Sequence, residues 1–149
     1  MIFIAHSSLD TGFAKTLARD MKQSGVDVWI DVIDIAPNTD WNASIQEALA
    51  RSHYLLVIWS KSSVISPEVL AEVFQSKSEN RQIIQVFKED CKRPAQFDRL
   101  QSIDFQQAYD EAFENLLSFL GKRGKRQRLE ELQQVMPYNP YPSVPELAG

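Results

Sequence analysis

The chain has 149 residues, enough for one domain with a buried core, and its 44% hydrophobic and 24% charged residues are typical of a soluble globular protein. No apolar run approaches the roughly 20 residues of a membrane span, and a single cysteine, Cys91, excludes an internal disulfide framework. Residues 1–120 carry 11 Lys and Arg against 17 Asp and Glu, so we expect a cytoplasmic protein that binds neither membranes nor nucleic acid.

Strands and helices are predicted to alternate along these 120 residues. In chain order, we expect a strand at 1–5, a helix capped by Asp10 that runs to about Ser24, a strand at 26–30 and a long loop at 31–40. A helix capped by Asp40 follows, with Trp41 on its inner face, and then a strand at 54–59. The next helix is opened by Ser66 and Pro67 and has Phe74 facing inward, and strands at 83–87 and 102–105 and a last helix around 113–120 complete the alternation. Ser66 can accept from the free amides of the first turn, and Pro67 lacks only a donor that would be unpaired there.

This alternation predicts an α/β fold with a largely parallel sheet and helices on both faces. For five strands joined by right-handed crossovers, the flavodoxin-like order 2-1-3-4-5 is the expected topology. The order of the strands then reverses between the first and third strands, and ligands bind open α/β sheets at such a point. The loops 6–9 and 60–65 border it, and Glu72 lies beside the same crevice on the helix that Ser66 begins.

The last part of the chain differs in composition from the first. Residues 121–149 combine five basic residues, a possible short helix at 129–135 and four prolines between 137 and 145. We interpret this segment as a basic short helix followed by a Pro-rich linker, leading to another domain in a larger protein.

Five segments occur in an order and spacing typical of one family. They are IFIAHSSLD at 2–10, GVDVWID at 25–31, DIAPNTDW at 34–41, SSVISPEVLAE at 62–72 and LQSIDF at 100–105. Together they resemble the Toll/interleukin receptor (TIR) domain in its prokaryotic form. The resemblance covers roughly residues 1–120, which it identifies as a TIR domain. It implies one of two functions, since some family members cleave NAD+ at the nicotinamide–ribose bond and others are adaptors that only associate with other TIR domains.

The resemblance places the catalytic glutamate of the family at Glu72. A cation develops on the ribose as nicotinamide leaves as a neutral molecule, so one carboxylate can suffice, as a stabilising charge or a nucleophile. No metal or cofactor is then expected, and NAD+ is the substrate. Without the resemblance, Glu72 would be interpreted as an ordinary solvated helix glutamate.

Other polar residues near the crevice are candidates for substrate binding. They are His6, Ser7, Ser8, Trp41, Ser60, Ser62 and Glu68. Each has a structural alternative: the serines can satisfy loop backbone, Trp41 can be a core residue and Glu68 can complement the helix dipole. Glu68 also departs from the family, which usually has an aromatic residue there; the change removes a stacking surface and adds a negative charge.

The resemblance further implies a mobile self-association loop. Its candidate residues are Asp34, Ile35, Pro37 and Asn38. The family usually has Gly after the proline, and Asn38 tolerates the same positive φ. We therefore expect an NAD+ glycohydrolase or cyclase that self-association activates, as the effector of a larger defence or signalling protein.

Two alternatives remain open from the sequence. The domain can be a non-catalytic module for TIR–TIR contact, in which changes at Pro37 matter and changes at Glu72 do not. A nucleoside deoxyribosyltransferase-like enzyme shares the layout and a glycosidic carboxylate. A phosphoacceptor receiver domain is disfavoured because the first strand ends in Ala5 and His6 without an acidic pair, and the third ends in Trp59.

Overall fold

The computed structural model of the chain describes residues 1–121. The chain divides into two compact units, Met1–Ala112 and Phe113–Gly149. The basic helix and Pro-rich linker predicted within 121–149 lie, apart from Gly121, outside the described residues, so that interpretation stays a prediction.

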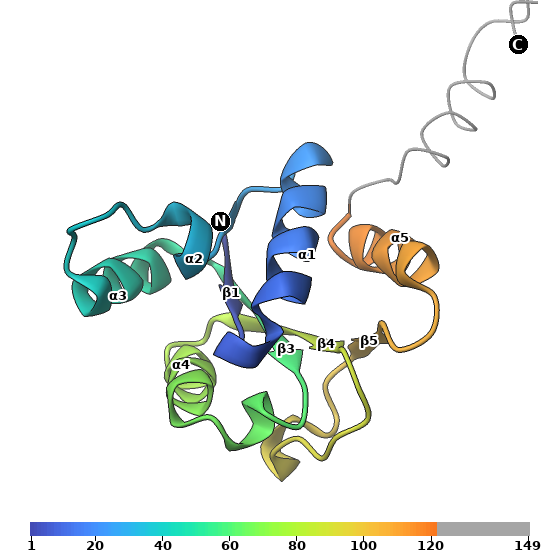
Figure 1. Cartoon of the computed structure of the whole chain (residues 1–149). Helices are drawn as coiled ribbons and strands as arrows, with labels where there is room; N and C mark the ends of the chain where they lie inside the picture. Colours follow the sequence, from blue (N-terminus) through green and yellow to red (C-terminus); the bar gives the residue numbers. More distant parts are fainter. Residues whose placement is uncertain (122–149) are drawn as a thin grey trace, which may run out of the picture. The chain divides into compact units, whose positions relative to one another are not determined.

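The first unit contains a five-stranded parallel sheet in the order β2-β1-β3-β4-β5, which confirms the predicted topology (Figure 1). The strands are β1 (Ile2–Ala5), β2 (Val28–Trp29), β3 (Tyr54–Trp59), β4 (Gln82–Phe87) and β5 (Ser102–Asp104). The second strand is shorter than predicted, because Ile30 already serves as the N-cap residue of the next helix. Central strand β3 is paired along its whole length with β4, so its carboxyl end is held rigidly.

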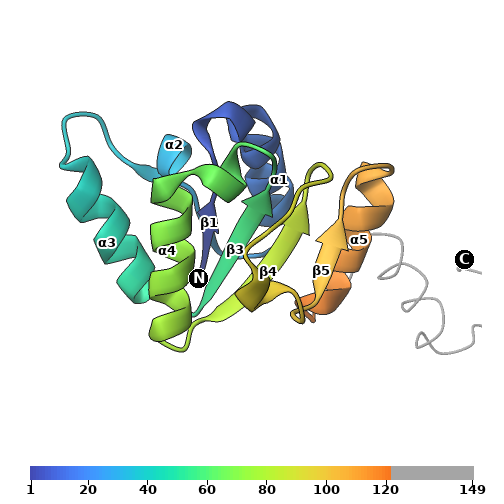
Figure 2. The same ribbon diagram turned by 90° about the horizontal axis from the view of Figure 1, so that it is seen from below.

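The helices follow the predicted alternation, with three additional short turns. The main helices are α1 (Thr11–Gln23), α2 (Asp31–Asp34), α3 (Trp41–Arg51), α4 (Pro67–Ser78) and α5 (Tyr109–Phe119). The single 3₁₀ turns are η1 (Ser8–Asp10), η2 (Ser63–Ile65) and η3 (Ala95–Phe97). Figure 2 shows α3 and α4 on one face of the sheet and α1 on the other, as the predicted layering requires.

Two of the three predicted helix caps form as expected. The Asp40 carboxylate accepts from the Ala43 amide at 3.1 Å, and the Ser66 hydroxyl accepts from the Val69 amide at 3.3 Å. These bonds satisfy first-turn donors that the helix itself cannot pair. Because the Ser66 cap fixes where α4 begins, it also fixes the position of the later α4 residues relative to the sheet.

The core beneath α3 and α4 orients both helices. It consists of alternate strand residues and the inner faces of the two helices, namely Phe3, Ala5, Trp29, Ala48, Leu49, Leu55, Val57, Trp59, Val69, Val73 and Phe97. Phe74, predicted to face inward, is 36% exposed and contacts the edge of this core through the Phe97 ring, with centroids 5.4 Å apart.

The predicted loop at 31–40 begins with a helical turn, α2. The Asp34 carboxylate accepts from the Ile30 amide at 2.7 Å and pairs with Lys22 at 3.0 Å, which anchors this turn to α1. The remaining loop is exposed apart from half-buried Ile35, which packs against the core. Asn38 has a φ of 63°, so it adopts the left-handed conformation that the sequence allowed for.

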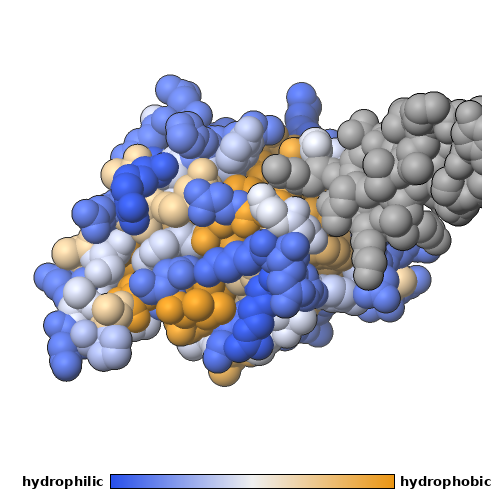
Figure 3. All heavy atoms as spheres, turned by 90° about the horizontal axis from the view of Figure 1, so that it is seen from above, coloured by the Kyte–Doolittle hydropathy of each residue, from blue (hydrophilic) through white to orange (hydrophobic). Residues whose placement is uncertain are grey.

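The surface shows no membrane-spanning element among the residues described. Within 1–121, no helix is both long and apolar enough to cross a bilayer. The face drawn in Figure 3 is largely hydrophilic around a central group of apolar side chains.

Asp10 differs from its predicted role as the side-chain cap of α1. Its carboxylate makes no capping bond; it is 3% exposed and is bonded instead to Lys88 at 2.8 Å, to the Ser60 hydroxyl and to the Ser62 hydroxyl at 3.3 Å. A buried carboxylate costs free energy unless charges and donors surround it, and these three groups supply them. Asp10 therefore joins the segments that follow β1, β3 and β4.

We predict that Asp10→Ala lowers the free energy of unfolding by about 2–3 kcal/mol, because it strands Lys88 and the two serines without their acceptor. Urea unfolding followed by circular dichroism measures the change. Asp27→Ala is the control: Asp27 is 81% exposed and lies 4.0 Å from the N-terminus. This control should change stability by less than about 0.5 kcal/mol. Equal losses in both variants would contradict the role given to Asp10.

Candidate active site

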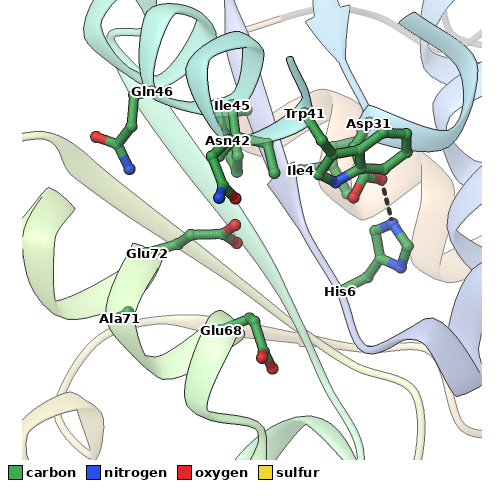
Figure 4. Close-up of a pocket in the computed structure, with 11 residues that line it drawn as sticks. Ile4, His6, Asp31, Trp41, Asn42, Ile45, Gln46, Glu68, Ala71 and Glu72 are labelled. Carbon is green, nitrogen blue, oxygen red and sulfur yellow. Dashed lines mark hydrogen bonds and ion pairs between the residues drawn. The ribbon is translucent and has the colours of Figure 1, made fainter. Parts of the chain in front are cut away.

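A pocket of about 330 Å³ opens between the carboxyl end of β1, the start of α3 and the first turns of α4 (Figure 4). Its lining residues are Phe3, Ile4, His6, Asp31, Trp41, Asn42, Ile45, Gln46, Glu68, Ala71 and Glu72. The volume is at the lower end of the range for ligand sites, which suits one nucleoside better than a whole dinucleotide. Four of the predicted site residues meet here: His6, Trp41, Glu68 and Glu72.

Glu72 extends from α4 into this pocket and is half-buried (Figure 4). Burial, followed by the negative charges of Asp31 and Glu68, raises the pKa of its carboxyl to about 8, although the charge of His6 partly opposes this rise. Glu72 is the sixth residue of α4, a helix capped by Ser66, so its backbone is fixed. Glu72 is therefore a carboxyl group that holds its proton near neutral pH and lacks an ion-pair partner within residues 1–121.

His6 and Asp31 form an ion pair at the wall of the pocket. The Nε2 atom of His6 donates to Asp31 Oδ1 at 2.9 Å, and Nδ1 donates to the Ser7 carbonyl at 2.9 Å. Only the doubly protonated ring can donate to both acceptors. Burial lowers the pKa of His6, but these two hydrogen bonds and the charges of Asp31 and Glu72 outweigh it and raise that pKa above its ordinary value.

Trp41 and Glu68 stand at the mouth of the pocket, on α3 and α4. Trp41 is 48% exposed, so the prediction that it lies on the inner face of its helix was wrong. It is the first residue of α3, whereas the buried residues of this helix, Ala48 and Leu49, lie near its other end. Glu68 is exposed in the first turn of α4, as expected for a carboxylate near a helix N-terminus, and accepts from the Ser66 hydroxyl at 3.3 Å.

The serines predicted to bind substrate do not line this pocket. The Ser60 and Ser62 hydroxyls are bonded to Asp10, and the Ser7 hydroxyl accepts from the Leu9 amide at 3.2 Å. Ser8 is exposed at the start of η1. The alternative that the serines satisfy loop backbone describes Ser7 and Ser60, because the Ser60 hydroxyl also accepts from the Ser63 amide at 3.1 Å.

The candidate self-association loop begins close to the pocket, since Asp34 follows three residues after the lining residue Asp31. Asp34 is exposed but bonded to Lys22, and Ile35 packs against the core. Pro37 and Asn38 are exposed and form the tip of the loop.

Three polar lining residues were not predicted: Asp31, Asn42 and Gln46. Among the sequence motifs, Asp31 appears only as the last residue of the segment 25–31. Its position directly after a predicted parallel strand could have indicated a site residue, because ligands bind at that edge of the sheet. Asn42 and Gln46 lie on the turn of α3 that faces α4, and their spacing of four residues puts them on one face. No group of three side chains able to ligate a metal was found in the described part of the chain.

Comparisons with known proteins agree on the family. The sequence model of the family described as TIR domain matches residues 2–117. The TIR domain of the Toll-related receptor TRR-2 from Hydra magnipapillata superposes with a TM-score of 0.70 at 18% identity, covering 81% of this chain and 98% of that one. The TIR domains of the activated Roq1 resistosome, which directly recognises the pathogen effector XopQ, superpose with a TM-score of 0.62 at 14% identity, covering 80% and 98%. A search of curated proteins gave no significant match.

We predict that Glu72→Gln stabilises the domain above neutral pH. The folded pKa of about 8 exceeds the ordinary 4.5, so the folded state holds the proton more tightly and wild-type stability falls as pH rises between these values. The amide cannot ionise, so the variant should gain about 2 kcal/mol over wild type at pH 8.5 and almost nothing at pH 4.5. Urea unfolding of both proteins at the two pH values measures this difference. Glu47→Gln, on an exposed face of α3, is the control; a gain independent of pH would contradict the burial of the Glu72 charge.

Proposed function

The chain belongs to the TIR domain family, and we propose that it cleaves NAD+ at the bond between nicotinamide and ribose. The observation that carries this proposal is the half-buried Glu72 carboxyl in a nucleoside-sized pocket, without an ion-pair partner within residues 1–121. The family alone does not select this activity, because it includes both NAD+-cleaving enzymes and adaptors. The site chemistry favours the enzyme.

The proposed reaction needs one carboxylate and no acid for the leaving group. The C1′–N1 bond breaks with its electron pair going to the pyridinium nitrogen, so nicotinamide departs neutral and positive charge develops on the ribose. Ionised Glu72 stabilises this cation or bonds to C1′ transiently. Water then adds to C1′ and loses a proton, giving ADP-ribose; attack by another group of the same molecule gives a cyclic product.

The raised pKa of Glu72 fits a site that ionises as its substrate binds. A proton occupies the carboxyl of the free site at pH 7, since the folded pKa is about 8. A pyridinium ring placed beside the carboxylate favours the ionised form, as any close positive charge does. The substrate therefore prepares the group that acts on it.

The ion pair between His6 and Asp31 supports the same chemistry by holding the wall of the pocket. The pair joins the residue after β1 to the residue that begins α2. When His6 is protonated, the pair carries no net charge. The net negative charge near the ribose then comes from Glu68, and from Glu72 once it is ionised.

We further propose that self-association activates the domain in a cytoplasmic defence or signalling protein. The pocket accommodates one nucleoside, so an adjoining copy is a source of contacts for the rest of the dinucleotide. Exposed apolar side chains near its mouth, Val32, Ile33 and Trp41, together with the Pro37–Asn38 tip, provide a surface for that contact. The same surface supports the second candidate, a non-catalytic TIR–TIR interaction module.

We predict that the artificially clustered domain consumes NAD+ and releases nicotinamide, and that Glu72→Ala lowers this rate by at least about 100-fold. Chromatography of nicotinamide release measures both rates, with Glu47→Gln as a control expected to match wild type. Clustered wild type without any turnover of NAD+ would favour the interaction module. Turnover of free nucleosides in place of NAD+ would favour a deoxyribosyltransferase-like enzyme.

We predict that kcat/KM for NAD+ rises with pH and levels off above about pH 8, because the free enzyme must lose the Glu72 proton whose pKa is about 8. Initial rates from pH 6 to pH 9.5 on the clustered domain measure the profile. A flat profile through this range would show that Glu72 is already ionised in the free enzyme.

We predict that Pro37→Ala weakens self-association without unfolding the domain, because Pro37 is exposed and contacts no buried cluster. Sedimentation should show a shift toward monomer, and NAD+ turnover should fall with it unless clustering is forced by a fused oligomer. If the variant assembles like wild type, the Pro37–Asn38 tip is not part of the contact.

A further inference from the structure

We infer that the pocket selects ligands whose ring carries a positive charge, and that the Glu68 carboxylate provides this selectivity by attracting the charged ring. The inference concerns the substrate class of the same site, and it goes beyond the proposed cleavage by assigning ring selectivity to a residue outside the reacting bond. It would apply equally to a ribosyl pyridinium held for cleavage and to one that is only bound.

The charges lining the pocket support this selectivity. Three carboxylates line it, those of Asp31, Glu68 and Glu72, and the cation among the lining residues is His6. His6 is paired with Asp31 at 2.9 Å, so the two glutamates of α4 remain uncompensated. No Lys or Arg is among the lining residues, and no ion pair to either glutamate forms within residues 1–121.

The arrangement of the two glutamates distinguishes their tasks. They are four residues apart on α4, so they project from the same face, one turn apart. Glu72 is half-buried and points into the pocket, whereas Glu68 is exposed at its mouth (Figure 4). A ligand with its ribose at Glu72 can therefore place its base near Glu68.

Trp41 supplies a second contact for a cationic ring. It lines the same pocket from α3, across from α4, with 48% of its surface exposed (Figure 4). An indole is the strongest of the side-chain rings in attracting a cation to its face. A pyridinium between Trp41 and the glutamates would therefore be favoured over a neutral ring of the same shape.

The protonation of Glu72 adds a competition to this arrangement. Burial is the largest cause of its raised pKa, and the charges of Asp31 and Glu68 add to it while His6 opposes them. Glu72 therefore holds a proton in the absence of a ligand. A bound pyridinium would favour the ionised carboxylate, so cation and proton compete.

The test compares two rings of nearly the same shape, 1-methylnicotinamide, which is cationic, and nicotinamide, which is neutral. Dissociation constants come from NMR titration of the ¹⁵N-labelled domain at pH 8.5. We expect wild type to bind the cation roughly ten-fold more tightly, and Glu68→Gln to lose most of that preference. Glu47→Gln makes the same charge change on α3 outside the pocket lining and should keep it.

Two further measurements make the outcome decisive. The affinity for 1-methylnicotinamide should rise from pH 6.5 to pH 9, as Glu72 loses its proton, whereas that for nicotinamide should not. Equal binding of the two rings, an unchanged preference in Glu68→Gln, or no measurable binding of the cation overturns the inference. NAD+ turnover without the preference would refute only this inference, and the preference without turnover would refute only the proposed cleavage.

Discussion

The ion pair between His6 and Asp31 determines the shape and the charge of the pocket. It connects the carboxyl end of β1 to the start of α2, and α2 leads into the loop that delivers α3 with Trp41. His6 is almost fully buried, so its charge is stabilised by Asp31 and by the Ser7 carbonyl and not by water. Protonated His6 and ionised Asp31 carry no net charge as a pair. The net negative charge that a ligand meets therefore comes from the glutamates of α4 when they are ionised.

A carboxylate placed in this way is costly to the fold and useful to the chemistry. Glu72 would be more stable in water, and only its position on a helix fixed by the Ser66 cap and the Val69–Val73 core holds it in the pocket. Such local instability is common where a protein binds or reacts with a ligand. Substitution of Glu72 is therefore expected to stabilise the fold and to inactivate the site. Both effects have the same cause, the burial of the Glu72 charge.

The fold could be predicted from the sequence because its signals are local. The strand order follows from the alternation of strands and helices, and the starts of α3 and α4 follow from Asp40 and Ser66. The site could be predicted only in part. Glu72 is identified by resemblance, and His6 by its place after β1. Ser60 and Ser62 lie outside the pocket lining, where their hydroxyls donate to Asp10, and no local pattern in the sequence reveals that contact.

We place the ribose of NAD+ at Glu72, with its pyridinium ring between Trp41 and Glu68. A crystal structure of the domain with a carbocyclic NAD+ analogue, which cannot be cleaved because a methylene replaces the ribose ring oxygen, would test this placement. We expect the C1′ atom of the analogue within contact distance of the Glu72 carboxylate and its cationic ring beside Trp41. An analogue bound instead at the Ser60–Ser62 loop, with Glu72 facing solvent, would contradict it.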